Sequence, residues 1–289
     1  MDRLRQQEQA LMKSQAQIDY WNGAAGAKWV AQADRLDQML APFSDALIIE
    51  AAPKSEDRIL DVGCGSGALT LAAIKAGNYQ SALGVDISAP LLELAKQRAS
   101  RTNVDIQFQQ SDASAMQLDD KFDLLISRFG VMFFADPIQA FSNLLAHMAP
   151  QGRLAFVCWR SLQLNHWAFA PLQSAKPFLK EPPTPPEPGA PGPFSFADEE
   201  RVLDILSDAG WSNIELKPFD TSIALPGGGP ESSAAFMMEI GPLSRLIEEQ
   251  GLDRTKIENA LTEHLTKHVS ASGHVEMNAA CWIVTASAS

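Results

Sequence analysis

Hydrophobic and polar positions follow two alternating patterns between residues 58 and 159. Short apolar runs, each bounded by polar or turn residues, predict strands at residues 58–62, 81–85, 105–109, 122–126 and 153–159. Apolar residues at helical spacing lie between these runs and predict helices beginning at Ala68 and at residues 91–99 and 138–148. Pro150 and Gly152 are expected to end the last helix. Because strands that alternate with helices form parallel sheets covered on both faces, the predicted fold class is α/β.

The first 52 residues are predicted to form a helical segment that precedes the sheet. Apolar residues recur at helical spacing from Trp29 to Phe43. Pro42 is expected to begin a second helix rather than continue the first, because proline lacks the N–H that a helix interior needs.

The chain after residue 159 has a looser pattern. Prolines are concentrated at residues 177–193 and predict an extended loop over the surface. Asp198 is a candidate cap for the helix that follows it. Gly241 and Pro242 should separate the first two of three later helices, at residues 233–240, 242–250 and 253–268. Two further strands are predicted, at residues 214–219 and 280–285.

Composition limits the classes of partner. The chain has 289 residues, of which 46% are hydrophobic, enough to bury a large core. A net charge of −12 argues against nucleic acid or an anionic membrane as the main partner, because both need a cationic face. With no apolar leader and no run of 18 apolar residues, a cytoplasmic location is expected. The three cysteines and five histidines lack the spacing of metal ligands, so no metal site is expected.

The segment after the first strand is the main candidate for chemistry. Residues 63–68 read Gly-Cys-Gly-Ser-Gly-Ala and lie between a predicted strand and a predicted helix. They fit the dinucleotide fingerprint G-x-G-x-x-G/A, which would indicate an NAD-dependent oxidoreductase. They also fit a turn that binds an adenosyl sulfonium. Asp86, at the end of the second strand, would meet a ribose diol in either cofactor and so leaves both open.

Asp61 favours the sulfonium cofactor. It lies two positions before Gly63, where a pyrophosphate would meet a negative charge and a sulfonium amino acid would present an ammonium group. Glycines at positions 63, 65 and 67 would also let the backbone pass close to a compact methionine-like moiety.

The segment after the third strand suits an adenine ring. Asp112 offers an acceptor to the exocyclic amine, and the N–H of Ala113 is placed to meet a ring nitrogen. Ile87 and Met116 are candidate apolar walls for the same ring.

Together these residues resemble the class I S-adenosylmethionine-dependent methyltransferases, especially the small-molecule group called methyltransferase type 11 or ubiquinone/menaquinone-biosynthesis-like. Five blocks carry the resemblance, at residues 20–26 with Trp29, 59–67, 84–88, 111–113 and 122–134. The resemblance extends over about residues 20–220 and the last strand.

The resemblance implies a Rossmann-like, mostly parallel seven-stranded sheet of order 3-2-1-4-5-7-6 with a helical cap, in which residues 280–285 form the antiparallel strand. It implies S-adenosyl-L-methionine as cofactor, S-adenosyl-L-homocysteine as product, a backbone contact at Ser127, and a lid between Trp21 and Trp29. With the residue arguments above, and with Cys64 as a small space-filler in the turn, the predicted cofactor-binding set is Trp29, Asp61, Gly63, Cys64, Gly65, Gly67, Asp86, Ile87, Asp112, Ala113 and Ser127.

Residues around the expected acceptor mouth each have a functional and a structural interpretation. His166 is the candidate general base, or else a cap-helix histidine bonded to backbone. Arg128 would bind an acidic acceptor or the cofactor carboxylate, or tie the lid to the core. Phe129 and Met132 line an acceptor pocket or pack the core, and Trp21 closes over the ligand or anchors the lid.

The predicted function is S-adenosylmethionine-dependent methyl transfer to a small-molecule acceptor by in-line displacement. An apolar or aromatic acceptor is preferred, because the cap is rich in Phe, Met, Trp and Pro. The alternatives are an NAD-dependent oxidoreductase, a non-catalytic binding module, and a methyltransferase acting on tRNA or protein, although the acidic charge weighs against RNA. We expect a monomer or homodimer, with a lid at residues 1–52 and a core at residues 53–289 that carries cap insertions at about residues 160–197 and 226–275.

Overall fold

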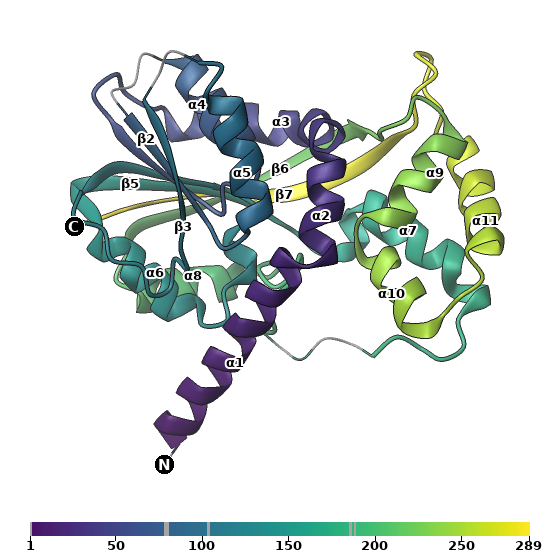
Figure 1. Ribbon diagram of the computed structural model, residues 1–289, viewed down its shortest axis with the longest axis horizontal. Helices are drawn as coiled ribbons and strands as arrows, with labels where there is room; N and C mark the ends of the chain where they lie inside the picture. Colours follow the sequence, from purple (N-terminus) through teal and green to yellow (C-terminus); the bar gives the residue numbers. More distant parts are fainter. Residues whose placement is uncertain (1, 78–80, 103–104, 185–186, 188) are drawn as a thin grey trace.

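A computed structural model of the protein describes the backbone of residues 2–77, 81–102, 105–184, 187 and 189–289, and the side chains from residue 10 onward within those ranges. Its central feature is a seven-stranded sheet of order β3-β2-β1-β4-β5-β7-β6 (Figure 1). The strands are β1 (Arg58–Val62), β2 (Ser81–Asp86), β3 (Ile106–Gln110), β4 (Phe122–Arg128), β5 (Met148–Trp159), β6 (Ser212–Ala224) and β7 (Glu276–Ser287). The predicted α/β class and the strand order are confirmed.

The direction of the strands also agrees with the prediction. The pairs among β3, β2, β1, β4 and β5 are parallel, whereas β7 pairs antiparallel with both β5 and β6. Leu60 in β1 and Leu124 and Leu125 in β4 are fully buried, as expected for central parallel strands covered on both faces. The carboxyl ends of the parallel strands therefore meet at one edge of a rigid sheet.

Helices cover the sheet on both faces. The helices α3 (Ala33–Ala51), α4 (Ala68–Ala76) and α5 (Ala89–Ala99) lie on one side, and α6 (Pro137–Ala146) and α8 (Glu199–Asp208) lie on the other (Figure 1). The predicted cap at Asp198 is confirmed, because its carboxylate accepts a hydrogen bond from the N–H of Arg201 at the start of α8. Asp136 caps α6 in the same way, through the N–H of Gln139.

The prediction for Pro42 is wrong. Pro42 lies inside the continuous helix α3 and does not begin a new one. Met39, Leu40 and Phe43 on that helix are buried against the sheet. Burial of this apolar face outweighs the one hydrogen bond that proline removes.

The predicted end of the helix at residues 138–148 is also wrong. Helix α6 ends at Ala146, and Met148 already belongs to β5, where it pairs with Phe122 of β4. The imidazole of His147 secures this junction, because Nδ1 lies 2.7 Å from the Asn143 carbonyl oxygen and Nε2 accepts from the Leu118 N–H. Pro150 and Gly152 are thus part of the strand and not the helix stop that we expected.

A helical cap lies beyond one end of the sheet. It contains α7 (His166–Ala175), α9 (Pro230–Glu239), α10 (Pro242–Gln250) and α11 (Arg254–Thr266) (Figure 1). The predicted break between α9 and α10 is confirmed at Gly241, which has a φ of 95°. In the proline-rich loop at residues 177–193, positions 185, 186 and 188 lie outside the described residues.

The N-terminal helices run across the carboxyl edge of the sheet. Helix α1 (Asp2–Asn22) projects from the body, and α2 (Ala24–Ala31) packs beside α5 before the chain enters α3 (Figure 1). Within the described residues, no helix is both long enough and apolar enough to span a membrane.

Candidate functional site

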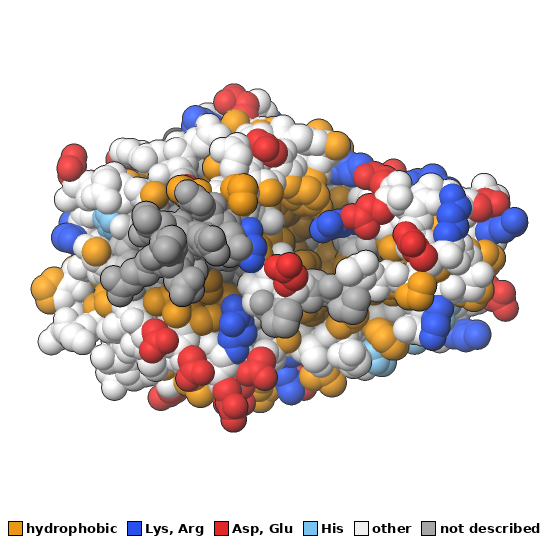
Figure 2. All heavy atoms as spheres, turned by 90° about the horizontal axis from the view of Figure 1, so that it is seen from below, with side chains coloured by type: hydrophobic (Ala, Val, Ile, Leu, Met, Phe, Trp, Pro, Cys, Tyr) orange, Lys and Arg blue, Asp and Glu red, His pale blue; other side chains and the backbone are white. Residues whose placement is uncertain are grey.

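A cavity opens at the carboxyl ends of β1, β2 and β4, beneath the N-terminal helices. Figure 2 shows it as a hollow with a hydrophobic interior on one face of the molecule. Thirteen of the predicted site residues line it: Trp21, Trp29, Asp61, Gly63, Cys64, Gly65, Asp86, Ile87, Asp112, Ala113, Arg128, Phe129 and Met132. Gly67, Ser127 and His166 do not. The structure therefore brings most of the predicted residues together around one space.

The glycine turn has the backbone conformation that the sequence suggested. Gly63 has a φ of 68°, and a Cβ there would lie 2.7 Å from the Cα of Gly130. Gly65 has a φ of 52°, but a Cβ there would meet no atom within 4 Å. The turn thus presses against the loop after β4 at Gly63 and faces open space at Gly65. Gly67 caps α4 behind the turn.

Asp61 is a fully buried carboxylate with one unsatisfied oxygen. Its Oδ2 accepts a 2.5 Å hydrogen bond from the Thr70 hydroxyl, while its Oδ1 has no partner among the described residues. Burial raises the pKa of Asp61 to about 7, although the Thr70 hydrogen bond and the charge of Arg128 oppose this shift. An unpaired buried acceptor on the cavity wall fits a cationic donor such as an ammonium group.

Asp86 is fixed by the backbone around it. Its Oδ2 accepts from the Gly65 N–H and its Oδ1 from the Ser88 N–H, each at 2.8 Å. Burial raises the pKa of Asp86, and these N–H groups oppose the rise. Because each carboxylate oxygen can accept a second hydrogen bond, the group can still receive a ribose diol.

Asp112 is already engaged by the N-terminal helix. Its Oδ2 accepts a 2.6 Å hydrogen bond from the hydroxyl of Ser14 in α1. Its Oδ1 accepts from both the N–H and the hydroxyl of Ser114. Helix α1 therefore contacts the predicted adenine end of the site directly.

Cys64 and Ser127 contribute to the shape of the site. Burial raises the pKa of the Cys64 thiol well above its usual range, and its sulfur would lie 2.9 Å from a Cβ at Gly84. Ser127 donates from Oγ to the Val62 carbonyl at 2.7 Å and so ties β4 to β1 below the turn. Cys64 is thus a space-filling neutral thiol in this geometry.

Arg128 is tied to helix α3. Its guanidinium donates to Asp37 Oδ1 at 3.0 Å and to the Ser44 hydroxyl at 2.9 Å. The other oxygen of Asp37 accepts from Arg98 at 2.8 Å. These contacts support the structural interpretation of Arg128, in which it ties the N-terminal helical segment to the core. Arg128 also lines the cavity.

The lid is latched to the loop after β2 by residues that sequence reasoning missed. Asn22 donates from Nδ2 to the Ile87 carbonyl and accepts from the Ala89 N–H, both at 2.9 Å. Ser88 donates from Oγ to the Trp21 carbonyl at 2.8 Å. Asn22 falls within the block at residues 20–26 that carried the family resemblance, but its sequence context alone gave no partner.

The part of the cavity beyond the glycine turn is aromatic. Trp21 makes edge contacts with Trp29 and Phe133, each with ring centroids 5.4 Å apart. Phe129 stacks on Trp159 at 3.9 Å with an interplanar angle of 10°. Trp167, Ile240 and Pro242 bring the helical cap to the same wall.

His166 is placed differently from our expectation. It is exposed at the first position of α7 and outside the cavity lining. Its charge contributes to lowering the pKa of the His264 imidazole, after burial and the charges of His268 and Lys267. A general-base role for His166 stays a prediction that this geometry does not favour.

Comparison with known proteins adds independent findings. Residues 59–152 match the family model described as "Methyltransferase domain". An uncharacterized protein of Mycobacterium tuberculosis is 32% identical over 196 residues, covering 65% of this chain and 68% of that protein. The demethylmenaquinone methyltransferase of Thermus thermophilus is 35% identical over 109 residues, covering 37% of this chain and 48% of that enzyme. The crystal structure of the Bacillus subtilis YcgJ protein is similar with a TM-score of 0.55 at 17% identity, over 86% of this chain and 98% of that one.

The fold, the glycine turn and these similarities define a methyltransferase. The chain belongs to the class I S-adenosylmethionine-dependent methyltransferases. It is an enzyme that catalyses methyl transfer with S-adenosyl-L-methionine as the methyl donor. The alternative of an NAD-dependent oxidoreductase is set aside.

Proposed function

We propose that this enzyme methylates a small, neutral acceptor with an apolar or aromatic body. The observation that carries the proposal is the wall beyond the glycine turn, built from Trp21, Phe129, Met132, Trp159 and Trp167. Such a wall buries a flat apolar molecule at low entropic cost, because aromatic side chains have few rotatable bonds. A highly charged acceptor would lose its hydration there without compensation.

The residues at the other end of the cavity suit the cofactor. Asp61 would hold the ammonium group, Asp86 the ribose diol, and Asp112 with Ala113 the adenine edge. The open space at Gly65 would admit the compact tail between them. When bound, the cofactor supplies a methyl group activated by a sulfonium.

The protein's own contribution is alignment and exclusion of water. The stacked pair of Phe129 and Trp159 would fix the plane of an aromatic acceptor, and the edge contacts of Trp21 would cover it. A transfer from a cation to a neutral acceptor spreads charge in its transition state, so an apolar wall does not oppose it.

The lining favours an acceptor that needs no protein base. Within the described part of the chain it includes no His, Lys, Glu or Tyr, and its carboxylates are those of the cofactor end and the Arg128 tie. We therefore propose an acceptor whose nucleophile is available without deprotonation by the enzyme, namely a weakly basic amine, which is neutral and has a free lone pair near pH 7.

The decisive experiment is detection of the product. Wild-type protein and the Asp86→Ala variant would be incubated with isotope-labelled S-adenosylmethionine and a total cell extract, followed by mass spectrometry of the small-molecule, protein and nucleic-acid fractions. We expect a labelled apolar or aromatic product with the wild type only. Labelled nucleic acid or protein, or a strongly anionic product, would refute the proposed acceptor class.

Three further features belong to this proposal. Residues 1–52 would act as the lid, and the insertions at about residues 160–197 and 226–275 as the cap of a core at residues 53–289. We also propose a cytoplasmic location and a monomeric or homodimeric state. Cell fractionation and light scattering test the last two.

A further inference from the structure

A neutral polar side chain on the cavity wall, that of Gln17, is unexplained by the cofactor site. Gln17 of helix α1 lines the cavity, and its Oε1 is buried with no hydrogen-bond partner among the described residues. Buried polar atoms are seldom left unpaired in folded proteins, and an unpaired one at a binding site points to a ligand group.

Helix geometry fixes where this amide lies. Ser14, Gln17 and Trp21 share one face of α1, because they are three and four residues apart. Ser14 is held by Asp112, and the carbonyl of Trp21 accepts from the Ser88 hydroxyl. The backbone of Gln17 is therefore held between two anchored positions on the face of α1 that lines the cavity.

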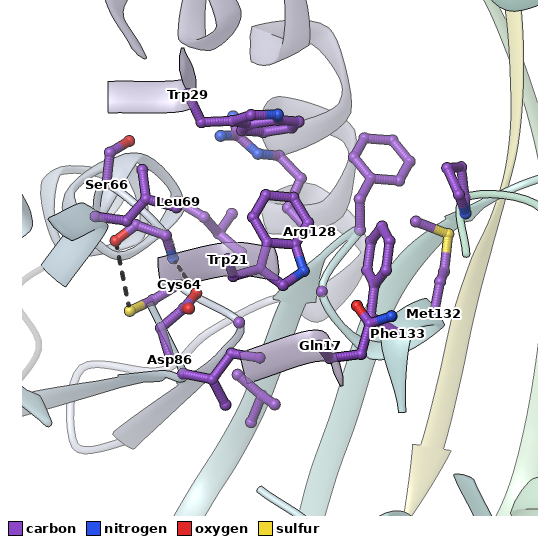
Figure 3. Close-up of a pocket in the computed structure, with 18 of the residues that line it drawn as sticks. Gln17, Trp21, Trp29, Cys64, Ser66, Leu69, Asp86, Arg128, Met132 and Phe133 are labelled. Atoms are coloured by element: carbon purple, nitrogen blue, oxygen red, sulfur yellow. Dashed lines mark hydrogen bonds between the residues drawn. The ribbon is translucent and has the colours of Figure 1, made fainter. Parts of the chain in front are cut away.

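The amide belongs to the acceptor side of the cavity. In Figure 3 the Gln17 amide lies on the same side as Met132 and Phe133, while Asp86 and Cys64 lie on the opposite side. The ring of Trp21, one turn after Gln17, is in edge contact with Phe133. The predicted cofactor contacts are made by other residues, at Asp61, the glycine turn, Asp86 and Asp112.

We propose that Gln17 recognises the acceptor by accepting a hydrogen bond from a hydroxyl or N–H group on its aromatic body. This assignment rests on the proposed function. A neutral amide selects such a group without favouring an anion or a cation, and the surrounding aromatic wall binds the remainder of the molecule. Gln17 thus sets which edge of a bound planar acceptor faces helix α1.

The test compares two planar probes that differ by one hydroxyl, 2-naphthol and naphthalene. Equilibrium dialysis would measure their Kd for the full-length protein saturated with S-adenosylhomocysteine. We expect the wild type to bind 2-naphthol about tenfold more tightly, the upper range for one neutral hydrogen bond. Gln17→Met keeps the length and apolar area of the side chain and should abolish this preference, with the Kd for S-adenosylhomocysteine unchanged.

The matched control is Gln15→Met. Gln15 lies on the same helix but is exposed, and among the described residues its amide bonds to Asp19, so this variant should retain the wild-type preference. If Gln17→Met fails to fold by circular dichroism, Gln17→Asn provides the second variant, since it withdraws the amide by one methylene and should reduce the preference.

Three results would overturn the assignment. The first is equal Kd values of the wild type for 2-naphthol and naphthalene. The second is a Gln17→Met variant that keeps the wild-type preference for 2-naphthol. The third is a Gln17→Met variant whose affinity for S-adenosylhomocysteine falls. The binding of naphthalene itself tests the proposed function separately. A wild-type complex with S-adenosylhomocysteine that binds neither probe refutes the proposed acceptor class, and the assignment of Gln17 fails with it.

Discussion

At the scale of single residues, Asp61 combines the two properties that matter most in the site. It is fully buried, and one of its oxygens has no partner among the described residues. Burial and the charge of Asp86 raise the pKa of Asp61, whereas Thr70 and Arg128 lower it, and burial has the largest effect. Asp61 is thus poised to lose its proton when a cation arrives.

We predict that binding of S-adenosylhomocysteine is linked to release of a proton from Asp61. The ammonium group favours the ionised carboxylate, whereas the free protein holds the proton up to a pKa of about 7. Affinity should therefore rise as the pH increases from 5 to 7 and level off above it. Calorimetry in buffers of different ionisation enthalpy measures the released proton.

The variant Asp61→Asn tests the origin of this linkage. It should weaken binding by about 10-fold to 100-fold, as expected for loss of a charged hydrogen bond, and remove the pH dependence below 7. An unchanged pH profile in the variant would assign the proton to another group. Asp123→Asn, which removes the charge from a half-buried pair with Arg58 outside the cavity lining, is the matched control.

The stability of the free protein should have the opposite pH dependence. Because the folded pKa of Asp61 lies above its usual value of 3.8, the folded state binds more protons than the unfolded state between pH 4 and 7. The contribution of Asp61 to the free energy of unfolding therefore falls across this range. Urea denaturation at pH 5 and pH 7.5 should show a smaller decrease for Asp61→Asn than for the wild type.

The sequence predicted some of these residues and not others for a physical reason. Asp61, Asp86 and Asp112 follow strands, and the carboxyl ends of parallel strands meet at one sheet edge, so their convergence was predictable. Ser14, Gln17, Asn22 and Asp37 reach the site from helices whose placement is decided by tertiary packing. No local pattern encodes that placement.

At the scale of elements, tertiary packing also explains the errors in the fold. The periodicity of apolar residues predicted that these strands and helices exist. It did not predict that α3 continues through Pro42, which is tolerated because the apolar face of α3 is buried. Helix α6 is shorter than predicted because Met148 pairs with Phe122 in the sheet. In both places a local signal was weaker than burial against β4 and β5.

The latch between α1 and the loop after β2 should control how long the cofactor stays bound. Asn22→Ala removes two hydrogen bonds from the Ile87 and Ala89 backbone, next to Asp86. We predict a severalfold faster dissociation of S-adenosylhomocysteine and faster amide hydrogen exchange in residues 14–22, since local opening needs less free energy. Stopped-flow fluorescence of Trp21 and Trp29 follows the dissociation.

Gln15→Ala is the control for this effect. It removes one exposed hydrogen bond, to Asp19, on the same helix. Equal dissociation rates for Asn22→Ala and the wild type would show that the aromatic contacts of Trp21 hold α1 without the latch.

At the scale of the whole molecule, the lid and the cap meet across the mouth of the cavity. Lys28 of α2 contacts Glu248 and Ser244 of α10, and Gln32 donates to Glu239 of α9 at 2.8 Å. These links join chain segments more than 200 residues apart. They are partly exposed, so they are suited to opening and not to holding the fold together.

We predict that Lys28→Met separates these two roles. Because exposed ion pairs contribute about 0–1 kcal/mol, the free energy of unfolding should change little. Opening of the mouth should become more frequent, seen as faster hydrogen exchange at residues 242–250 and faster dissociation of 2-naphthol from the S-adenosylhomocysteine complex. Added salt should produce the same changes in the wild type and smaller ones in the variant, because screening acts on a charge that the variant lacks. The control Lys256→Met breaks a comparable exposed pair with Asp253, the N-cap residue of α11, outside the cavity lining, and should leave the probe's dissociation unchanged. If both variants behave alike, the mouth is held by the aromatic wall, and the ion pair between lid and cap has no part in admitting the acceptor.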